Sequence, residues 1–196
     1  MEETARALEN LYRTGKIRAI GVSNFTPEQM DELQKTVPLH SLQPPYNLFE
    51  RDVEHEILPY CRENGIATIT YGALCRGLLT GKMREDTQFT GDDLRKNDPK
   101  FQGERYRQYL NAVAELDSFA RERYQTNVLA LALRWLVDQP GVTTALWGAR
   151  RPEQLDPVGE IEGWSLDKEA MAAIDDILAR CIDDPVGPEF MAPPAR

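Results

Sequence analysis

Apolar residues recur along this chain in two alternating patterns, one typical of amphipathic helices and one typical of short buried strands. Over residues 4–14 the apolar positions share one helical face, and Gly15 suits the C-terminal cap. Strands are predicted at 17–22, 41–46, 66–71 and 142–147, where the residues are apolar or β-branched. Further helices are predicted at 51–63, 109–124, 128–137 and 165–181, and another begins with residues 152–158. Pro59 is expected to kink the first of them.

Three segments carry more specific local signals. Residues 26–29 predict a helix start, because Thr26 can cap it, Pro27 suits the first turn and Gln29 completes a capping box. The 128–137 helix is apolar on nearly every side, which predicts that it is deeply packed. The polar stretch 83–107 is too long for an ordinary loop, so we expect a functional flap or excursion there.

The order of these elements bounds the fold class. Helices that alternate with strands predict an α/β protein with a parallel sheet and right-handed crossovers. Four such strands form either an open half-barrel or a small doubly wound sheet, and periodicity alone does not choose between them. In a half-barrel two apolar strand edges stay open, and open edges invite pairing with another chain. After residue 183 the chain contains Pro185, Pro188, Pro193 and Pro194, so we expect an irregular tail.

Composition limits the binding partners and the cellular compartment that we expect for this protein. The net charge of −9 argues against nucleic acid or an anionic membrane as partner. No run reaches the ~18 apolar residues that a membrane span needs, and the first residues lack the order of a secretory signal. The scattered cysteines Cys61, Cys75 and Cys181 predict reduced thiols and a cytoplasmic location. With His40 and His55 as the histidines, no spacing indicates a metal site.

Each predicted strand ends in polar or aromatic residues. Ser23 and Asn24 follow the first strand, Gln43 lies in the second, Tyr71 ends the third and Trp147 ends the fourth. Taken singly these residues are ordinary, because a Ser-Asn pair is commonly a turn or helix cap and a strand-end tyrosine is commonly a core or rim residue. The carboxyl ends of parallel strands share one edge, where barrels place their ligands, so we expect all four strand ends to converge on one site.

Four longer motifs share one feature, namely that they stand in the order in which one family carries them. They are Gly-Val-Ser-Asn-Phe at 21–25, Gln-Pro-Pro-Tyr-Asn-Leu at 43–48, Tyr-Gly-Ala-Leu-Cys-Arg-Gly-Leu-Leu-Thr-Gly-Lys at 71–82 and Trp-Gly-Ala-Arg-Arg-Pro-Glu-Gln-Leu at 147–155. Together they resemble the aldo-keto reductases, and most closely the bacterial stress-protein and oxidoreductase branch. The resemblance implies the C-terminal half, about four βα units, of a TIM (β/α)8 barrel with an extra C-terminal helix. Residues 1–182 would be the partial barrel and 183–196 an irregular Pro-rich tail.

The resemblance also implies a nicotinamide dinucleotide as cofactor. Ser23, Asn24 and Gln43 would hydrogen-bond its carboxamide, Tyr71 would stack on the nicotinamide ring, and residues 72–77 would run along the pyrophosphate. The cofactor-binding residues implied in this way are Ser23, Asn24, Gln43, Tyr71, Gly72, Ala73, Leu74, Arg76, Gly77, Gly148, Arg150 and Gln154.

The end of the fourth predicted strand bears on the choice of nucleotide. Arg150 and Arg151 precede a predicted helix start, and guanidinium groups at a helix N-terminus favour a phosphate, hence NADPH, with NADH left open. The chain departs here from the common family pattern, because Gly148 and Ala149 stand in place of Lys-Ser and Gln154 in place of Arg. In the alternative interpretation the two arginines are a solvated basic pair that caps the last helix.

The family's reaction moves a hydride from NADPH to a small carbonyl substrate while a tyrosine, tuned by Lys, Asp and His, donates a proton. Those four residues belong to strand ends that would precede this chain, so we assign no catalytic residue here and expect the isolated chain to be inactive. One alternative is a non-catalytic nucleotide-binding half-barrel that forms a homodimer through its open edges. Another is a small doubly wound α/β protein with unrelated chemistry.

Overall fold

The computed structural model describes residues 2–191 and contains a four-stranded parallel sheet in the order β1-β2-β3-β4. The strands are β1 (Gly21–Ser23), β2 (Ser41–Gln43), β3 (Ala67–Thr70) and β4 (Val142–Ala145). Gly21 pairs with Ser41, and the register shifts between Thr68 and Ile69 where β3 meets β4. The strand order follows the sequence with no reversal, whereas a doubly wound sheet reverses at a switch point. The α/β class is therefore confirmed, and the doubly wound alternative is wrong.

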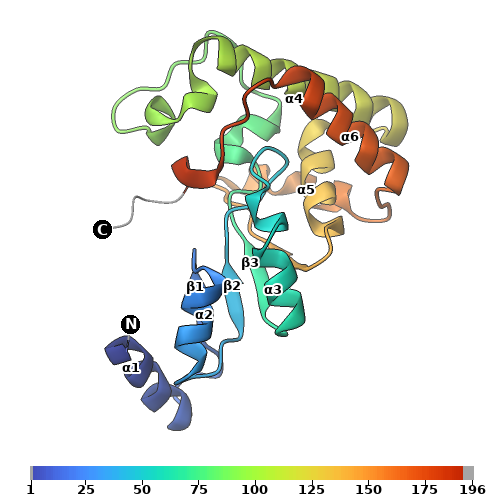
Figure 1. Cartoon of the computed structure of the whole chain (residues 1–196). Coiled ribbons are helices and arrows are strands. Elements are labelled where there is room, and N and C mark those ends of the chain that lie inside the picture. Colours follow the sequence, from blue (N-terminus) through green and yellow to red (C-terminus); the bar gives the residue numbers. More distant parts are fainter. Residues whose placement is uncertain (1, 192–196) are drawn as a thin grey trace.

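The described part of the chain contains six α-helices. They are α1 (Glu2–Arg13), α2 (Pro27–Gln34), α3 (Ile57–Glu63), α4 (Gly103–Tyr124), α5 (Val128–Asp138) and α6 (Lys168–Cys181). Figure 1 shows α4, α5 and α6 gathered at one end of the molecule, while α1 and α2 lie at the other end beside β1 and β2. Residues far apart in sequence thus form one helical layer in which α4 packs against both α5 and α6.

Two local predictions are confirmed in detail. At the start of α2 the backbone N–H of Gln29 donates to Thr26 Oγ1 at 3.3 Å, and the backbone N–H of Thr26 donates to Gln29 Oε1 at 2.9 Å. This is the reciprocal pair of a capping box. Helix α5 is buried over most of its length, and its Leu131 and Leu136 are fully buried, as its apolar sequence predicts.

Several predicted elements differ from the observed ones. The strands are shorter than predicted, and β1 begins only at Gly21. The predicted 51–63 helix is split into a 3-10 turn (Asp52–Glu54) and α3. Pro59 lies in the first turn of α3, where its missing N–H removes no helical hydrogen bond, so it causes no kink.

The prediction that an α-helix begins at 152–158 is wrong. The structure has two 3-10 segments there, Pro152–Gln154 and Asp156–Ile161. Pro157 lacks the N–H that a continuous α-helix would use at this position, and its ring would clash with the preceding turn. In the predicted flap at 83–107, 3-10 turns form at Leu94–Asn97 and Pro99–Phe101, and α4 already begins at Gly103.

The described part of the tail packs along α4. The backbone N–H of Val186 donates to the Tyr109 hydroxyl at 2.9 Å, and Arg105 forms an ion pair with Asp184. A 3-10 turn follows at Pro188–Phe190, and Figure 1 shows this turn at the left of the view. The tail is therefore attached as far as this turn. The predicted irregular residues Pro193 and Pro194 lie outside the described residues.

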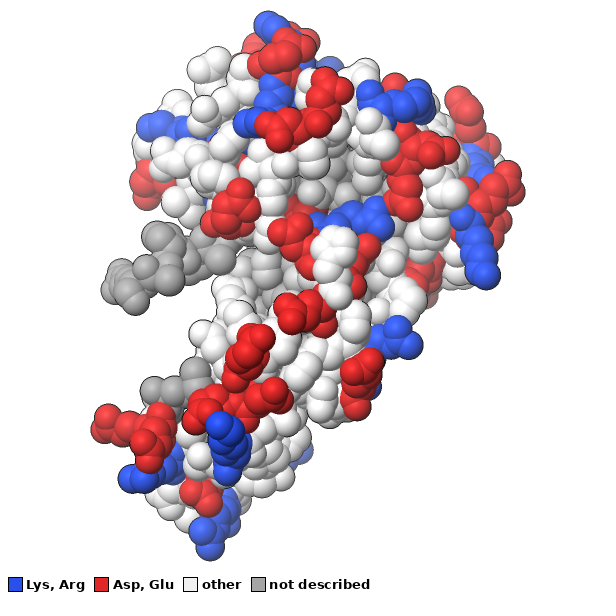
Figure 2. Space-filling view, viewed as in Figure 1, with Lys and Arg blue, Asp and Glu red and all other residues white. Residues whose placement is uncertain are grey.

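The surface carries charges of both signs. Figure 2 shows acidic and basic side chains interspersed over the face in view. Among the helices in residues 2–191, none is long and apolar enough to cross a membrane. The cysteines Cys61, Cys75 and Cys181 are all buried and free.

Candidate functional site

The ends of β1 and β2 are joined by two hydrogen bonds to one carbonyl. Ser23 Oγ donates to the carbonyl oxygen of Gln43 at 3.0 Å, and the backbone N–H of Asn24 donates to the same oxygen at 3.2 Å. Ser23, Asn24 and Gln43 are all exposed. The sequence prediction that these polar residues gather at one edge of the sheet is therefore met by direct contacts.

Tyr71, directly after β3, reaches across β2 to the end of β1. Its hydroxyl donates to Asn24 Oδ1 at 3.1 Å. Burial raises the pKa of Tyr71, so its hydroxyl stays protonated and remains a donor at neutral pH. Because Oδ1 accepts from Tyr71, the Nδ2 group is the end of the Asn24 amide that can donate to a ligand. Asn24 itself has a φ of +57°, a left-handed conformation that asparagine tolerates well.

Four of the six residues in the loop that follows Tyr71 have left-handed backbone. Gly72, Cys75, Arg76 and Gly77 have φ values of +75°, +45°, +52° and +91°. The backbone N–H of Cys75 donates to the Gly72 carbonyl at 2.8 Å, and that of Gly77 donates to the Leu74 carbonyl at 2.9 Å. We call residues 72–77 the glycine loop. Ala73 is buried and Leu74 half-buried, so these two contribute backbone rather than exposed side chains.

Arg76 is engaged by the C-terminal tail. Its Nη2 donates to the carbonyl of Phe190, and its Nε lies 3.3 Å from the sulfur of Met191. A Cβ built on Gly72 would lie 2.5 Å from Cε of Met191, which shows how closely the tail approaches the loop. The Arg76 guanidinium therefore faces the tail in this structure, and its use for a phosphate requires that this contact change.

The residues after β4 form a separate turn. Oε1 of Gln154 accepts from the backbone N–H of Arg150 at 2.6 Å and from that of Arg151 at 3.1 Å. Gln154 thus caps the 3-10 turn. The expected α-helix start is wrong, because a three-residue 3-10 turn forms here and has no comparable dipole. Binding of a phosphate by Arg150 stays a prediction. Gly148 and both arginines are exposed.

The polar stretch 83–107 connects this turn with the glycine loop. Hydrogen bonds from Arg95 lower the pKa of Asp93 to about 2, and the charge of Arg150 adds to that shift. Arg95 Nη1 also donates to the Arg76 carbonyl at 3.4 Å. Arg95 therefore attaches the polar stretch to the glycine loop after β3.

Sequence reasoning missed the residues that support the site from inside. Asn47 is fully buried, and its Nδ2 donates to the Gly72 carbonyl at 3.0 Å. Beside it, Arg51 Nε donates to Glu54 Oε1 at 2.6 Å, and its Nη1 donates to Asp175 Oδ1 at 2.5 Å. Asn47 stands four residues after Gln43, but no sequence pattern distinguishes such a buried amide from a turn residue.

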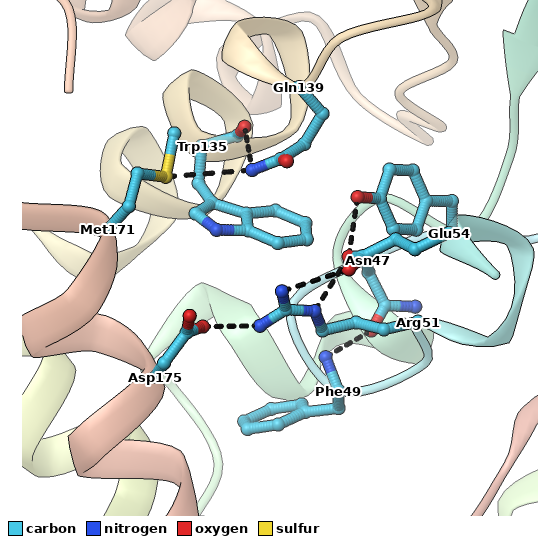
Figure 3. A network of polar contacts seen from close by, with 9 residues as sticks. Asn47, Phe49, Arg51, Glu54, Trp135, Gln139, Met171 and Asp175 are labelled. Carbon is cyan, nitrogen blue, oxygen red and sulfur yellow. Dashed lines mark hydrogen bonds and ion pairs between the residues drawn. The ribbon is translucent and has the colours of Figure 1, made fainter. Parts of the chain in front are cut away.

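Figure 3 shows the Arg51 side chain between Glu54 and Asp175, with the indole of Trp135 alongside. The guanidinium carbon lies 5.1 Å from the Trp135 ring centroid, a cation–π distance. Glu54 Oε1 also accepts from the Tyr46 hydroxyl at 2.7 Å. This cluster joins the loop after β2 to α5 and α6, and so fixes the segment that carries Asn47. Among residues 2–191, no group of three or more His, Cys, Asp or Glu side chains is arranged to hold a metal ion.

Comparison with known proteins identifies the family of the chain. The sequence profile described as "Aldo/keto reductase family" matches residues 1–179. The aldo-keto reductase YhdN of Bacillus subtilis is 58% identical over all 196 residues, and the NADH-specific methylglyoxal reductase of Escherichia coli is 35% identical over 153 residues, 78% of this chain. The solved glycerol dehydrogenase AKR11B4 of Gluconobacter oxydans superposes on 97% of this chain with a TM-score of 0.88 and 53% identity.

The chain is shorter than these relatives. It spans 59% of the Bacillus protein, 46% of the Escherichia coli reductase and 57% of the Gluconobacter chain. The profile match covers most of the chain, and the sequence and structural similarity extend over nearly all of it. The chain therefore belongs to the aldo/keto reductase family.

Proposed function

We propose that this chain is the nicotinamide dinucleotide-binding part of an aldo-keto reductase, an enzyme that interconverts carbonyls and alcohols. One observation carries the proposal. At the carboxyl edge of three neighbouring parallel strands, Ser23 and Asn24 both donate to the Gln43 carbonyl, and Tyr71 donates to Asn24. This is the edge at which parallel α/β barrels bind ligands.

The donor set fits a nicotinamide carboxamide. A carboxamide needs both donors and acceptors, which the amides of Asn24 and Gln43 and the Ser23 hydroxyl supply. The Tyr71 ring is half-exposed and held at its hydroxyl by Asn24, so it offers a flat face of fixed orientation for stacking. When bound, the dinucleotide supplies the hydride; the residues of this chain bind and orient it.

The glycine loop fits a pyrophosphate, which its backbone can approach closely at Gly72 and Gly77. Arg76 and Arg150 are the guanidinium groups that we assign to the phosphates, with Gly148 and Gln154 forming the turn beside Arg150. We propose NADPH as the preferred cofactor because an additional phosphate rewards a second guanidinium. NADH remains the competing nucleotide, and one relative is named for NADH specificity.

We further propose that residues 1–182 form about four βα units of a (β/α)8 barrel, with residues 183–196 as a tail. The sequential order of the four parallel strands supports this architecture. The names of the relatives, a methylglyoxal reductase and a glycerol dehydrogenase, favour a small carbonyl or polyol substrate. The free, buried cysteines favour a reducing compartment, the cytoplasm.

A second candidate is a non-catalytic module that binds nucleotide and forms a homodimer. In residues 2–191, β1 and β4 each pair with one strand only, which leaves two sheet edges for a second copy. Light scattering tests this candidate: a stable dimer supports it, and a monomer contradicts it.

The main proposal is tested by binding and turnover together. Purified chain should bind NADPH saturably and should not oxidise it in the presence of methylglyoxal, because no catalytic residue is assigned here. Loss of binding in the Tyr71→Ala variant supports the site. Turnover by the isolated chain would contradict the assignment of a cofactor-binding part alone.

A further inference from the structure

A cluster of buried charges lies next to the glycine loop. Glu50, Asp98 and Lys100 are each 1% exposed or less. Lys100 Nζ lies 2.7 Å from Oε1 of Glu50 and 3.1 Å from Oδ1 of Asp98. The cluster joins the loop after β2 to the polar stretch 83–107, two segments about fifty residues apart in sequence. Charges this deeply buried persist only when they are paired.

The cluster is connected to the glycine loop through one amide. Nδ2 of Asn47 donates to Oε2 of Glu50 at 2.6 Å and to the Gly72 carbonyl at 3.0 Å. Oδ1 of Asn47 accepts from the backbone N–H of Phe49 at 2.9 Å, so the orientation of the amide is fixed. An unbroken series of contacts therefore runs from Lys100 through Glu50 and Asn47 to Gly72.

The far end of this series holds an unfavourable conformation. After Gly72, the side-chain-bearing residues Cys75 and Arg76 have φ values of +45° and +52°. Such residues occupy the left-handed region only where the surrounding structure holds them there. Asn47 attaches the first residue of the glycine loop, and so limits how the rest of the loop can relax.

Stability alone does not account for these polar groups. Burial raises the pKa of Glu50, and Lys100 acts against that shift. Burial alone would lower the pKa of Lys100, but Glu50, Cys75 and Asp98 together raise it above its ordinary value. Buried ion pairs can commonly be replaced by apolar residues of similar volume without loss of stability. An apolar residue at position 50, however, cannot accept a hydrogen bond from Asn47.

We propose that Glu50 and Lys100 are positioning residues for nucleotide binding. Lys100 fixes the carboxylate of Glu50, Glu50 fixes the amide of Asn47, and Asn47 holds the Gly72 carbonyl so that the glycine loop is formed before a pyrophosphate arrives. The inference rests on the proposed function of that loop in nucleotide binding.

Two matched triple variants separate positioning from a merely structural role. The first combines Glu50→Leu, Asp98→Asn and Lys100→Met, and the second replaces Glu50→Leu by Glu50→Gln. Both remove the same three charges, and Asp98→Asn keeps the acceptor for the backbone N–H of Lys100 that lies at 3.0 Å. They differ at position 50 alone, where Gln can accept from Asn47 and Leu cannot. Arg180→Met, which breaks the exposed pair with Glu115, is the control for a charge change elsewhere.

Two measurements are made on each full-length variant, after its thermal unfolding midpoint has shown that it folds. The first is amide hydrogen exchange of Cys75 and Gly77 without nucleotide, since both N–H groups are bonded within the loop. The second is the dissociation constant for NADPH. The Glu50→Leu triple variant should exchange these amides about tenfold faster and bind NADPH about tenfold more weakly, and the Glu50→Gln triple variant should recover both.

Equal exchange rates and equal affinities in the two triple variants would overturn the inference. If the Glu50→Leu variant fails to fold, Asn47→Ala provides the second test, because it breaks the series while the Glu50–Lys100 pair stays intact. Faster exchange at Cys75 and Gly77 in Asn47→Ala supports positioning, and unchanged exchange overturns it. If the wild-type chain binds no NADPH, the proposed function fails, yet the exchange measurement still decides whether Glu50 and Asn47 hold the loop.

Discussion

The hydroxyl of Tyr71 donates a hydrogen bond to Oδ1 of Asn24 at 3.1 Å, and so joins the end of β3 to the end of β1 across the intervening β2. The contact fixes both partners. It holds the Tyr71 ring in one orientation, and it leaves Nδ2 as the donor end of the exposed Asn24 side chain. A stacking face and a hydrogen-bond donor are thereby placed beside each other before any ligand binds.

This relationship predicts different effects for two substitutions of Tyr71. Tyr71→Phe keeps the ring but loses the hydrogen bond to Asn24 that orients it, worth about 1 kcal/mol, so affinity for NADPH should fall about fivefold at most. Tyr71→Ala also loses the stacking face, worth about 2 kcal/mol, and should weaken binding about thirtyfold or more. Fluorescence titration measures both constants. Equal losses in the two variants would mean that the ring does not contact the nucleotide.

Two substitutions of Asn24 separate its effect on the stability of the fold from its effect on nucleotide binding. At a φ of +57°, alanine costs about 1 kcal/mol relative to glycine. Asn24→Ala should therefore unfold about 2–4 °C below Asn24→Gly. Both variants lack the side-chain amide, so both should bind NADPH equally weakly. Thermal unfolding by circular dichroism and a parallel titration make the comparison, and a marked difference in affinity would show that the amide is not the binding group.

The Asp93–Arg95 pair predicts a dependence of stability on acid pH. Hydrogen bonds from Arg95 lower the pKa of Asp93 to about 2 from an ordinary value of 3.8. A carboxylate with a lowered pKa stabilises the folded state above its unfolded pKa, and that contribution is lost as the pH falls through its folded pKa.

Asp93→Asn should therefore lower the free energy of unfolding near neutral pH and flatten its decline on acidification, so that the mutant and wild-type curves converge in strong acid. Urea unfolding at a series of pH values measures this dependence, with Asp92→Asn at the neighbouring exposed position as the matched control. Parallel curves for wild type and Asp93→Asn would contradict the ion pair.

The contact between the tail and Arg76 predicts competition with the nucleotide. Removal of residues 188–196 frees Arg76 from the Phe190 carbonyl and from Met191. A hydrogen bond to a charged group contributes about 1.5 kcal/mol, so NADPH affinity should rise by roughly tenfold at most. The same truncation in an Arg76→Met background should change nothing. Weaker binding after truncation would instead mean that the tail supports the site.

The sequence predicted those features that depend on local chemistry. The alternation of helix and strand, the capping box at Thr26 and the burial of α5 follow from residue spacing within single segments. The convergence of Ser23, Asn24, Gln43 and Tyr71 follows from a general rule for parallel sheets, so it too could be predicted.

The remaining features depend on contacts between distant segments. Lys100 lies in a stretch rich in charged residues, where solvated side chains are the ordinary expectation, yet it is fully buried because Glu50 and Asp98 surround it. The contact of the tail with Arg76 joins residues more than one hundred positions apart, so no local sequence pattern indicates it.

The break of the predicted helix near Pro157 could have been predicted from the sequence, because an interior proline opposes an α-helix.

The most direct test of the central proposal is a titration of the purified chain with NADPH. Binding is monitored by energy transfer from tryptophan to the reduced nicotinamide. Trp147 lies two residues after the end of β4 and is one of the chain's three tryptophans. We predict saturable binding at a single site, weakened strongly by Tyr71→Ala and by Gln43→Leu and unaffected by Arg180→Met. Absence of saturable binding, or binding that Tyr71→Ala and Gln43→Leu leave unchanged, would contradict the assignment of the strand-end residues as the cofactor site.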